Sequence, residues 1–193
     1  MALKQPQPPE NCADVIVEAL GRLSAGLDEI ITDFDLSQLS LAAPHPVYLL
    51  EYDDLPMGGL DAATKTGWRY LVLHRGSVVA AAEVELQRQG TVMQFAGINV
   101  GPNVDGFLRA VAAAEQSDRG QQKAGYKVRW LTMPTARAMA LWLHRRQDDW
   151  LIPVPPTFQR YEAYVLYRPE ELFELLARPV NEGFMLELER VQV

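Results

Sequence analysis

Cysteine and histidine are both scarce in this sequence, which contains one cysteine and three histidines. A single cysteine, Cys12, cannot form an intramolecular disulfide, and it leaves no cysteine cluster for zinc. The histidines, His45, His74 and His144, are far apart in sequence, and none has a second ligand at the spacing of a known zinc motif. We therefore predict no metal site. The lack of a disulfide framework makes the cytoplasm the expected location.

Positive charge and long apolar runs are also lacking. The 18 Lys and Arg residues are outnumbered by 25 Asp and Glu residues, which gives a formal net charge of −7. Because contact with a phosphate backbone depends on clustered Lys and Arg, we predict no nucleic-acid partner. The sequence has no run near the ~18 consecutive apolar residues of a membrane helix. Residues 1–9 also lack the basic and apolar segments of a secretory signal, so we predict no membrane association.

The composition that remains is typical of a globular protein with one domain. The chain has 193 residues, of which 48% are hydrophobic and 22% charged, and a chain of this length can bury a sizeable core. We predict a proline-rich, disordered leader at 1–10 and a single mixed α/β domain at 11–193. This domain has an N-terminal helix at 11–36 and a sheet core at 47–193. Gly21 and Gly26 weaken the helix, so it needs a packing partner, either the sheet or the same helix of a second copy in a homodimer.

The stretch 68–100 carries the strongest strand pattern. Residues alternate on both sides of a tight turn at 75–77, which predicts a β-hairpin, and a third strand follows. The run 79–82 is apolar at every position, as in a strand covered on both faces. Gly97 interrupts the third strand, as a glycine at a bulge does. We interpret 68–100 as the middle of the sheet.

The remaining elements complete an α+β fold, with a central mixed, largely antiparallel sheet flanked by helices. Because strands and helices alternate after residue 100, we expect at least one parallel pair of strands. The predicted elements are a connector at 37–46 that contains Pro44 and Pro46, strands at 47–52, 126–133, 150–154, 159–167 and 184–189, and helices at 102–117, 134–146 and 169–177.

Specific catalytic motifs are absent from the sequence, so the catalytic residues stay unknown. There is no GxSxG elbow and no GxxxxGK[ST] phosphate loop. Glu83 and Glu85 share one face of a strand, where like charges would repel if buried; this favours a solvent-facing position over an acid–base couple. Phe95, Trp130 and Trp142 come from different elements and are candidates to line one ligand pocket, although aromatic residues more often fill a core.

Between residues 47 and 167, the order of predicted elements resembles that of the GNAT superfamily of N-acyltransferases. In that family, a hairpin like that at 71–84 is followed by a bulged strand and then by a helix whose N-terminal loop holds the coenzyme A pyrophosphate. The segment 100–108 looks like this step from strand to helix. The resemblance implies Gly101, Asn103 and Gly106 as the ligand-binding loop, since free N–H groups at a helix N-terminus suit an anion. It also implies acetyl-CoA or another acyl-CoA as cofactor.

Several positions differ from the pattern of that family. Asn103 stands where the loop has Arg or Gln, and Leu108 stands where it has Gly or Ala. Trp142 replaces a tyrosine that often serves as general acid, and Gln94 is found where a glutamate base is usual; an indole N–H is not a usable acid. We therefore predict a ligand-binding or protein-interaction domain without cofactor that is not a working acyltransferase. The alternative is a diverged acyl-CoA-dependent N-acyltransferase that uses water or Glu83 as base.

Overall fold

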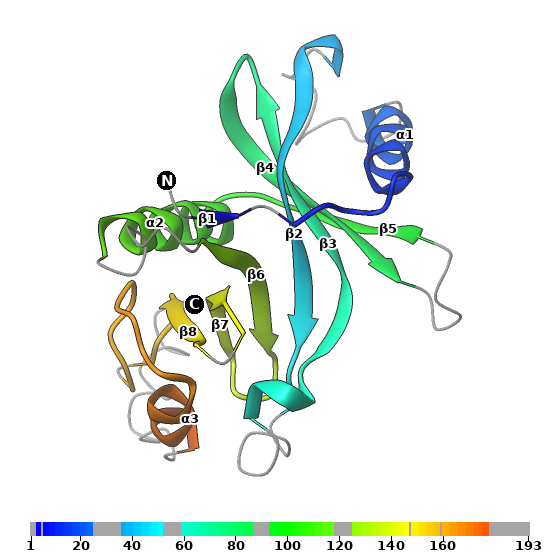
Figure 1. The fold of residues 1–193 in the computed structure, drawn as a ribbon. Coiled ribbons are helices and arrows are strands. Elements are labelled where there is room, and N and C mark those ends of the chain that lie inside the picture. The colour runs from blue at the N-terminus through cyan, green and yellow to red at the C-terminus, as the bar shows by residue number, and fades with distance from the viewer. Residues whose placement is uncertain are drawn as a thin grey trace, which may run out of the picture.

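The computed structural model describes residues 3–4, 6–24, 36–51, 59–86, 93–117, 125–146, 148–158 and 160–177. Figure 1 shows the helices arranged around a twisted sheet. In chain order the elements are β1 (Leu3–Lys4), α1 (Cys12–Ser24), the 3-10 helix η1 (Leu36–Gln38), β2 (Leu39–Leu49), the 3-10 helix η3 (Gly59–Ala62), β3 (Thr64–His74), β4 (Ser77–Leu86), β5 (Met93–Asn99), α2 (Pro102–Gln116), β6 (Tyr126–Met133), β7 (Ala138–His144), β8 (Trp150–Val154) and α3 (Pro169–Ala177).

The strands form one eight-stranded sheet in the order β5-β4-β3-β2-β6-β7-β8, with β1 also paired to β6. Neighbouring strands are antiparallel except at β6, which runs parallel to both β2 and β1. The predicted α+β class, with a mixed and largely antiparallel sheet flanked by helices, is therefore confirmed. The strands before and after α2 are not neighbours, because β4, β3 and β2 lie between β5 and β6 (Figure 1).

The middle strand of this order is β2, not a strand of the 68–100 stretch. β3 and β4 are internal strands, whereas β5 lies at the edge, so the prediction that 68–100 forms the middle of the sheet is wrong. The apolar run in β4 is covered on both faces as expected. Ala81 packs in the cluster beneath α2, and Ala80 and Ala82 pack in the cluster beneath α1.

The helices lie on two faces of the sheet. Val104, Phe107 and Ala110 of α2 pack on one face, against a cluster that includes Trp130. α1 packs over β3 and β4 on the other face, and α3 packs over β7 and β8. Cross-strand pairing shows that α1 and α3 share this face. Tyr48 packs against the α3 cluster, and its cross-strand partner is Lys65. The amine of Lys65 lies over Trp68, which belongs to the α1 cluster.

The connector predicted at 37–46 is mostly strand, because β2 runs from Leu39 to Leu49. Its two prolines occupy positions where the backbone N–H that proline lacks is not needed for hydrogen bonding between strands. Pro44 lies in an irregularity between Ala42 and His45, and Ala43 there has a φ of 50°. Pro46 precedes the three residues of β2, Val47–Leu49, that pair with β6.

Two predictions in the last third of the sequence are also wrong. The helix expected at 134–146 is a turn followed by strand β7. Met139, packed with Leu141 and Leu143, faces the α2 cluster, while Ala140 and Trp142 face the α3 cluster. A strand that is apolar on both faces has no period of two, so its run is easily assigned to a buried helix. Of the strand expected at 159–167, the described part consists of turns and one bridge between Tyr167 and Leu151.

The two ends of the chain complete the comparison with the predicted elements. Within the leader, Leu3 and Lys4 pair with Tyr126 and Lys127 of β6, and residues 6–9 have no regular structure. The last predicted strand, 184–189, lies outside the described residues, as does the C-terminal part of the helix predicted at 11–36. None of the helices in the described part of the chain is long and apolar enough to span a membrane.

Candidate functional site

A small pocket lies where β2 and β6 separate beneath α2. β2 pairs with Trp130–Thr132 of β6, and β1 pairs with Tyr126 and Lys127 farther along the same strand. Between these two pairings the irregularity in β2 bends its backbone away. The pocket has a volume of about 100 Å³. Its lining is apolar except for one imidazole, and consists of Leu3, Ala43, Pro44, His45, Leu71, Phe107, Leu108, Val111 and Val128.

His45 supplies this imidazole. Its side chain is 1% exposed, and its ring stacks on Phe107 at 4.3 Å with an interplanar angle of 10°. Nδ1 lies 2.7 Å from the carbonyl oxygen of Ala43, so Nδ1 carries the proton and donates it to that oxygen. Burial lowers the pKa of His45 to about 3; the Ala43 carbonyl opposes this shift and nearby Arg69 adds to it. The ring is therefore neutral at physiological pH, and its buried Nε2 is an acceptor that has no hydrogen-bond partner within the described part of the chain.

Arg69 is the cross-strand partner of His45 and is 2% exposed. Its guanidinium lies over the Trp130 ring at 4.8 Å, and its Nε lies 3.4 Å from Oε1 of Glu83. The same Glu83 oxygen accepts a hydrogen bond from Nδ2 of Asn99 at 3.3 Å. Burial lowers the pKa of Arg69 and raises the pKa of Glu83, and each group opposes the shift of the other. In the segments that the structure describes, the buried Nε and Nη2 of Arg69 make no hydrogen bond, although Nε lies in the ion pair with Glu83.

His45, Arg69, Glu83, Phe107 and Trp130 therefore form one cluster beneath α2, which we call the His45–Arg69 cluster. Among the described residues, three of its buried polar atoms have no hydrogen-bond partner: the acceptor Nε2 of His45 and the donors Nε and Nη2 of Arg69, on neighbouring strands. An unsatisfied buried polar group costs about 1–3 kcal/mol. A bound group that donates a hydrogen bond to His45 would remove the cost of Nε2. Because Glu83 balances the charge of Arg69 and His45 is neutral, this place favours a neutral group over an ion.

The predicted loop residues lie at the beginning of α2. Gly101 precedes the helix with a φ of 70°, a conformation that favours glycine, and Asn103 lies in the first turn. Gly106 is buried, and a Cβ there would lie 3.4 Å from the Cβ of Val154. α2 therefore lies close to β8 at this position, with room for a Cβ but not for a bulky side chain.

The predicted pocket aromatics lie in three separate places. Phe95 packs in the cluster beneath α1, Trp130 in that beneath α2, and Trp142 in that beneath α3, so they do not line one pocket. Glu83, expected to face solvent, is 26% exposed and paired with Arg69, whereas Glu85 is exposed. No group of three or more His, Cys, Asp or Glu side chains among the described residues is placed to hold a metal ion.

The two residues that define the cluster, His45 and Arg69, were not among the predicted site residues. His45 lies between two prolines in a segment that suggested a connector, and Arg69 follows the alternation of its strand. The available signal was Arg69 itself, a charged residue flanked by Trp68 and Tyr70 in an otherwise apolar strand. A charge at such a position is buried only when it is paired.

No family model matches this chain, and no curated protein or solved structure matches it at a significant level. The resemblance to the GNAT superfamily is not tested by these comparisons and stays a prediction.

Proposed function

We propose that the protein is a ligand-binding domain without a catalytic role, and that its ligand occupies the pocket between β2, β6 and α2. The observation that carries this proposal is the unpaired Nε2 of His45 at the wall of an apolar pocket. Ligand sites are typically apolar cavities with a few convergent polar groups that fix orientation. The content of a single cysteine favours a cytoplasmic location.

The chemistry of the wall defines the class of ligand. The apolar lining suits a short branched or cyclic hydrocarbon body. The head group must donate a hydrogen bond to His45, the one polar side chain of the lining, which a primary carboxamide or an alcohol does. A water molecule also donates such a bond, so the minimal occupant is an ordered water. A ligand that displaces this water gains if it reproduces the hydrogen bond to His45.

Isobutyramide is a suitable probe because it carries a carboxamide on a short branched body. We expect its titration to shift the backbone amide signals of residues 43, 45, 107–111 and 128 in two-dimensional ¹H–¹⁵N NMR spectra. His45→Phe keeps a ring beside Phe107 but removes the acceptor, so these shifts should disappear. His74→Phe, on the neighbouring strand, is the matched control and should bind as the wild type does.

A second variant keeps the test decisive if His45→Phe does not fold. Leu108→Phe places a larger side chain at the rim of the pocket and should weaken isobutyramide binding at least tenfold. Equal shifts in the wild type and in both variants would show that isobutyramide binds elsewhere. No shift in the wild type at tens of millimolar probe would leave water as the occupant and refute the proposal.

The alternative function, an acyl-CoA-dependent N-acyltransferase, is favoured by one observation. Burial raises the pKa of Glu83, which moves this carboxylate toward the range of a general base. Isothermal titration with acetyl-CoA separates the two functions. Micromolar binding that is weakened by Asn103→Asp would support the acyltransferase, whereas no heat at millimolar acetyl-CoA would remove it. Gly106 is unsuitable for this test, because a bulky residue there would collide with β8.

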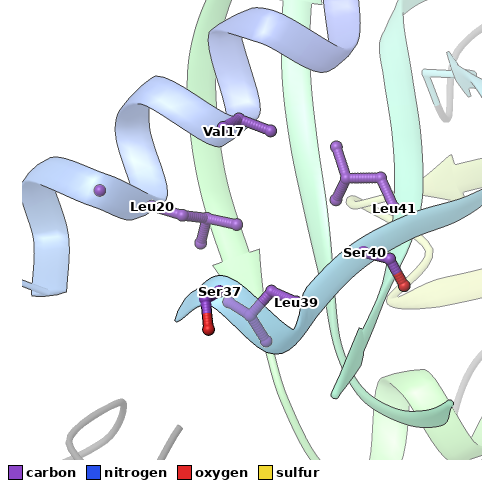
Figure 2. A pocket seen from close by; sticks show the side chains of 7 residues that line it. Val17, Leu20, Ser37, Leu39, Ser40 and Leu41 are labelled. Carbon is purple, nitrogen blue, oxygen red and sulfur yellow. The ribbon is translucent and has the colours of Figure 1, made fainter. Parts of the chain in front are cut away.

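We also propose that the protein forms a homodimer through α1. An apolar groove of about 380 Å³ lies between α1 and the beginning of β2, with Leu20 and Leu39 among its walls. Figure 2 shows Val17 and Leu20 of α1 directed toward Leu39 and Leu41. Val17 is 61% exposed, and an exposed apolar side chain beside an apolar groove is typical of a protein contact. The α1 helix of a second copy would cover both the Val17 side chain and the groove.

Light scattering as a function of concentration tests the dimer. Val17→Glu should give a monomer mass at concentrations where the wild type gives a dimer. Val100→Glu is the matched control, because Val100 is 50% exposed and lies at the end of β5. A wild-type mass that stays monomeric at every concentration would contradict this proposal.

A further inference from the structure

A row of cationic and aromatic side chains crosses the face of the sheet opposite α2. Lys65 and Trp68 come from β3, Tyr48 from β2, Arg129 from β6 and Trp142 from β7. Tyr48 pairs with Lys65, and Arg129 pairs with Trp142, so these side chains point to the same face. We call these five residues the cationic row. It lies between the clusters beneath α1 and α3, on the opposite face from the His45–Arg69 cluster.

Arg129 is held between two rings. Its guanidinium lies 4.8 Å from the centre of the Tyr48 ring and 4.3 Å from that of Trp142, and these two rings contact each other edge to face at 5.0 Å. Stacking occupies the faces of the guanidinium and leaves its N–H edge for hydrogen bonding. Among the described residues, that edge has neither a hydrogen-bond acceptor nor a carboxylate within 4.0 Å.

Lys65 has a similar environment. Its Nζ lies 4.2 Å above the Trp68 ring, and no carboxylate of the described chain forms an ion pair with it. Burial lowers the pKa of Lys65, with Cys12 opposing and Arg129 adding to the shift; burial also lowers the pKa of Arg129, with Tyr48 and Asp149 opposing. Each cation is therefore partly desolvated, and the two repel each other.

The acid that could balance this charge is already engaged. Asp149, on the α3 side of the row, accepts hydrogen bonds from Nε1 of Trp142 at 3.1 Å and from Nδ1 of His144 at 2.8 Å. Both bonds involve Oδ1, and they fix the carboxylate beside the aromatic end of the row. The two cations thus share a place that an external anion would stabilise.

We propose that Lys65 and Arg129 bind the phosphate group of a small organic phosphate, with the ring of that ligand against Tyr48, the partly exposed aromatic side chain of the row. A phosphate monoester carries a charge of about −1.5 to −2 at neutral pH, which matches two cations. The edge of Arg129 suits two phosphate oxygens, and the Lys65 amine contributes a point charge. Trp68 and Trp142 are each 3% exposed and pack against the cations, whereas the partly exposed Tyr48 offers surface for a flat ring. This site is separate from the pocket beneath α2 and does not depend on the function proposed there.

Isothermal titration at low salt with phenyl phosphate, inorganic phosphate and benzoate tests this assignment. We expect phenyl phosphate to bind more tightly than inorganic phosphate, because the ring adds contacts, and more tightly than benzoate, because benzoate carries a single charge. Benzoate binding as tight as that of phenyl phosphate would overturn the assignment to phosphate. If the wild type binds none of the three compounds, the proposal of an anion site on the cationic row is refuted.

Charge-removing variants locate the site on the row. Arg129→Gln and Lys65→Gln should each weaken phenyl phosphate binding about tenfold or more, since each removes a charged hydrogen bond. Arg109→Gln removes the same charge from an exposed position on α2 and should leave the affinity within about twofold of the wild type. If Arg129→Gln does not fold, Lys65→Gln alone decides. An equal loss in Arg109→Gln would show general attraction instead of a site.

Discussion

Replacement of His45 by phenylalanine should reduce the loss of stability that the protein suffers on acidification. In the folded protein the buried imidazole has a pKa of about 3, against 6.5 for an exposed histidine. The unfolded chain therefore binds a proton at His45 at pH values where the folded chain does not. Stability from this residue is present above pH 6.5 and is lost as the pH falls from 6.5 toward about 3.

The expected magnitude follows from the difference between the two pKa values. Each pH unit below 6.5 removes about 1.4 kcal/mol from the free energy of unfolding, so at pH 5 the wild type has lost about 2 kcal/mol through His45. Phenylalanine keeps a ring against Phe107. It loses the hydrogen bond to Ala43, which is worth about 1 kcal/mol, and it also removes the buried Nε2. At pH 7 the two proteins should therefore agree within about 1 kcal/mol.

Urea unfolding followed by tryptophan fluorescence at pH 7, 6 and 5 measures this difference. The carboxylates titrate alike in both proteins, so the informative quantity is the difference between the wild-type and His45→Phe unfolding free energies at each pH. It should change by about 2 kcal/mol between pH 7 and pH 5 in favour of the variant. His74→Phe controls for the loss of an imidazole elsewhere. If the difference is the same at pH 7 and pH 5, His45 is not a buried neutral imidazole and the argument is refuted.

Three further predictions test other parts of the fold. Gly67→Ala would place a Cβ 2.0 Å from a main-chain oxygen of β4 and should destabilise by about 3 kcal/mol in urea unfolding, whereas Gly97→Ala, which meets nothing within 4 Å, should cost less than about 1 kcal/mol. Glu83→Gln leaves the buried Arg69 without its counter-charge and should lower the unfolding free energy by about 2 kcal/mol at pH 7; an unchanged midpoint would show that the pair is not needed. Burial raises the pKa of Asp148, but hydrogen bonds from two arginines, a tyrosine and a tryptophan outweigh this and hold it below its usual range. Its contribution is present above about pH 4 and is lost as the pH falls further, so Asp148→Asn should show a smaller drop in melting temperature between pH 5 and pH 3 than the wild type.

The fold class was predictable because most elements carry a clear period. The hairpin of β3 and β4 follows its alternating pattern and its turn, and α2 begins at Pro102 as the step after Gly101 indicates. The first part of β2, before Val47, and the strand β7 were not predictable for physical reasons. β2 tolerates its prolines because one lies in an irregularity and the other lies before the pairing with β6 begins, and both are properties of the sheet. β7 is apolar on both faces, so its sequence has no period of two.

The candidate site was less predictable than the fold. Trp130 belongs to the His45–Arg69 cluster and Glu83 supplies its carboxylate, and both residues were singled out from the sequence. The pairing of His45 with Arg69 depends on the register of β2 against β3, which local sequence does not specify once two prolines interrupt the strand. The stacking on Phe107 depends on α2 crossing the sheet over strands that come earlier in the chain.

The short pairing of β2 with β6 divides the sheet into two halves. One half is the antiparallel meander β2–β5, and the other is β6–β8; three residue pairs between Val47–Leu49 and Trp130–Thr132 join them. Each half is built from neighbours in sequence, whereas this junction joins residues about 80 positions apart, so its formation costs more chain entropy. The pocket lies across the junction, with walls from both halves. A molecule bound there would contact both halves and stabilise their association. Amide hydrogen exchange in β3 and in β7 should then slow together.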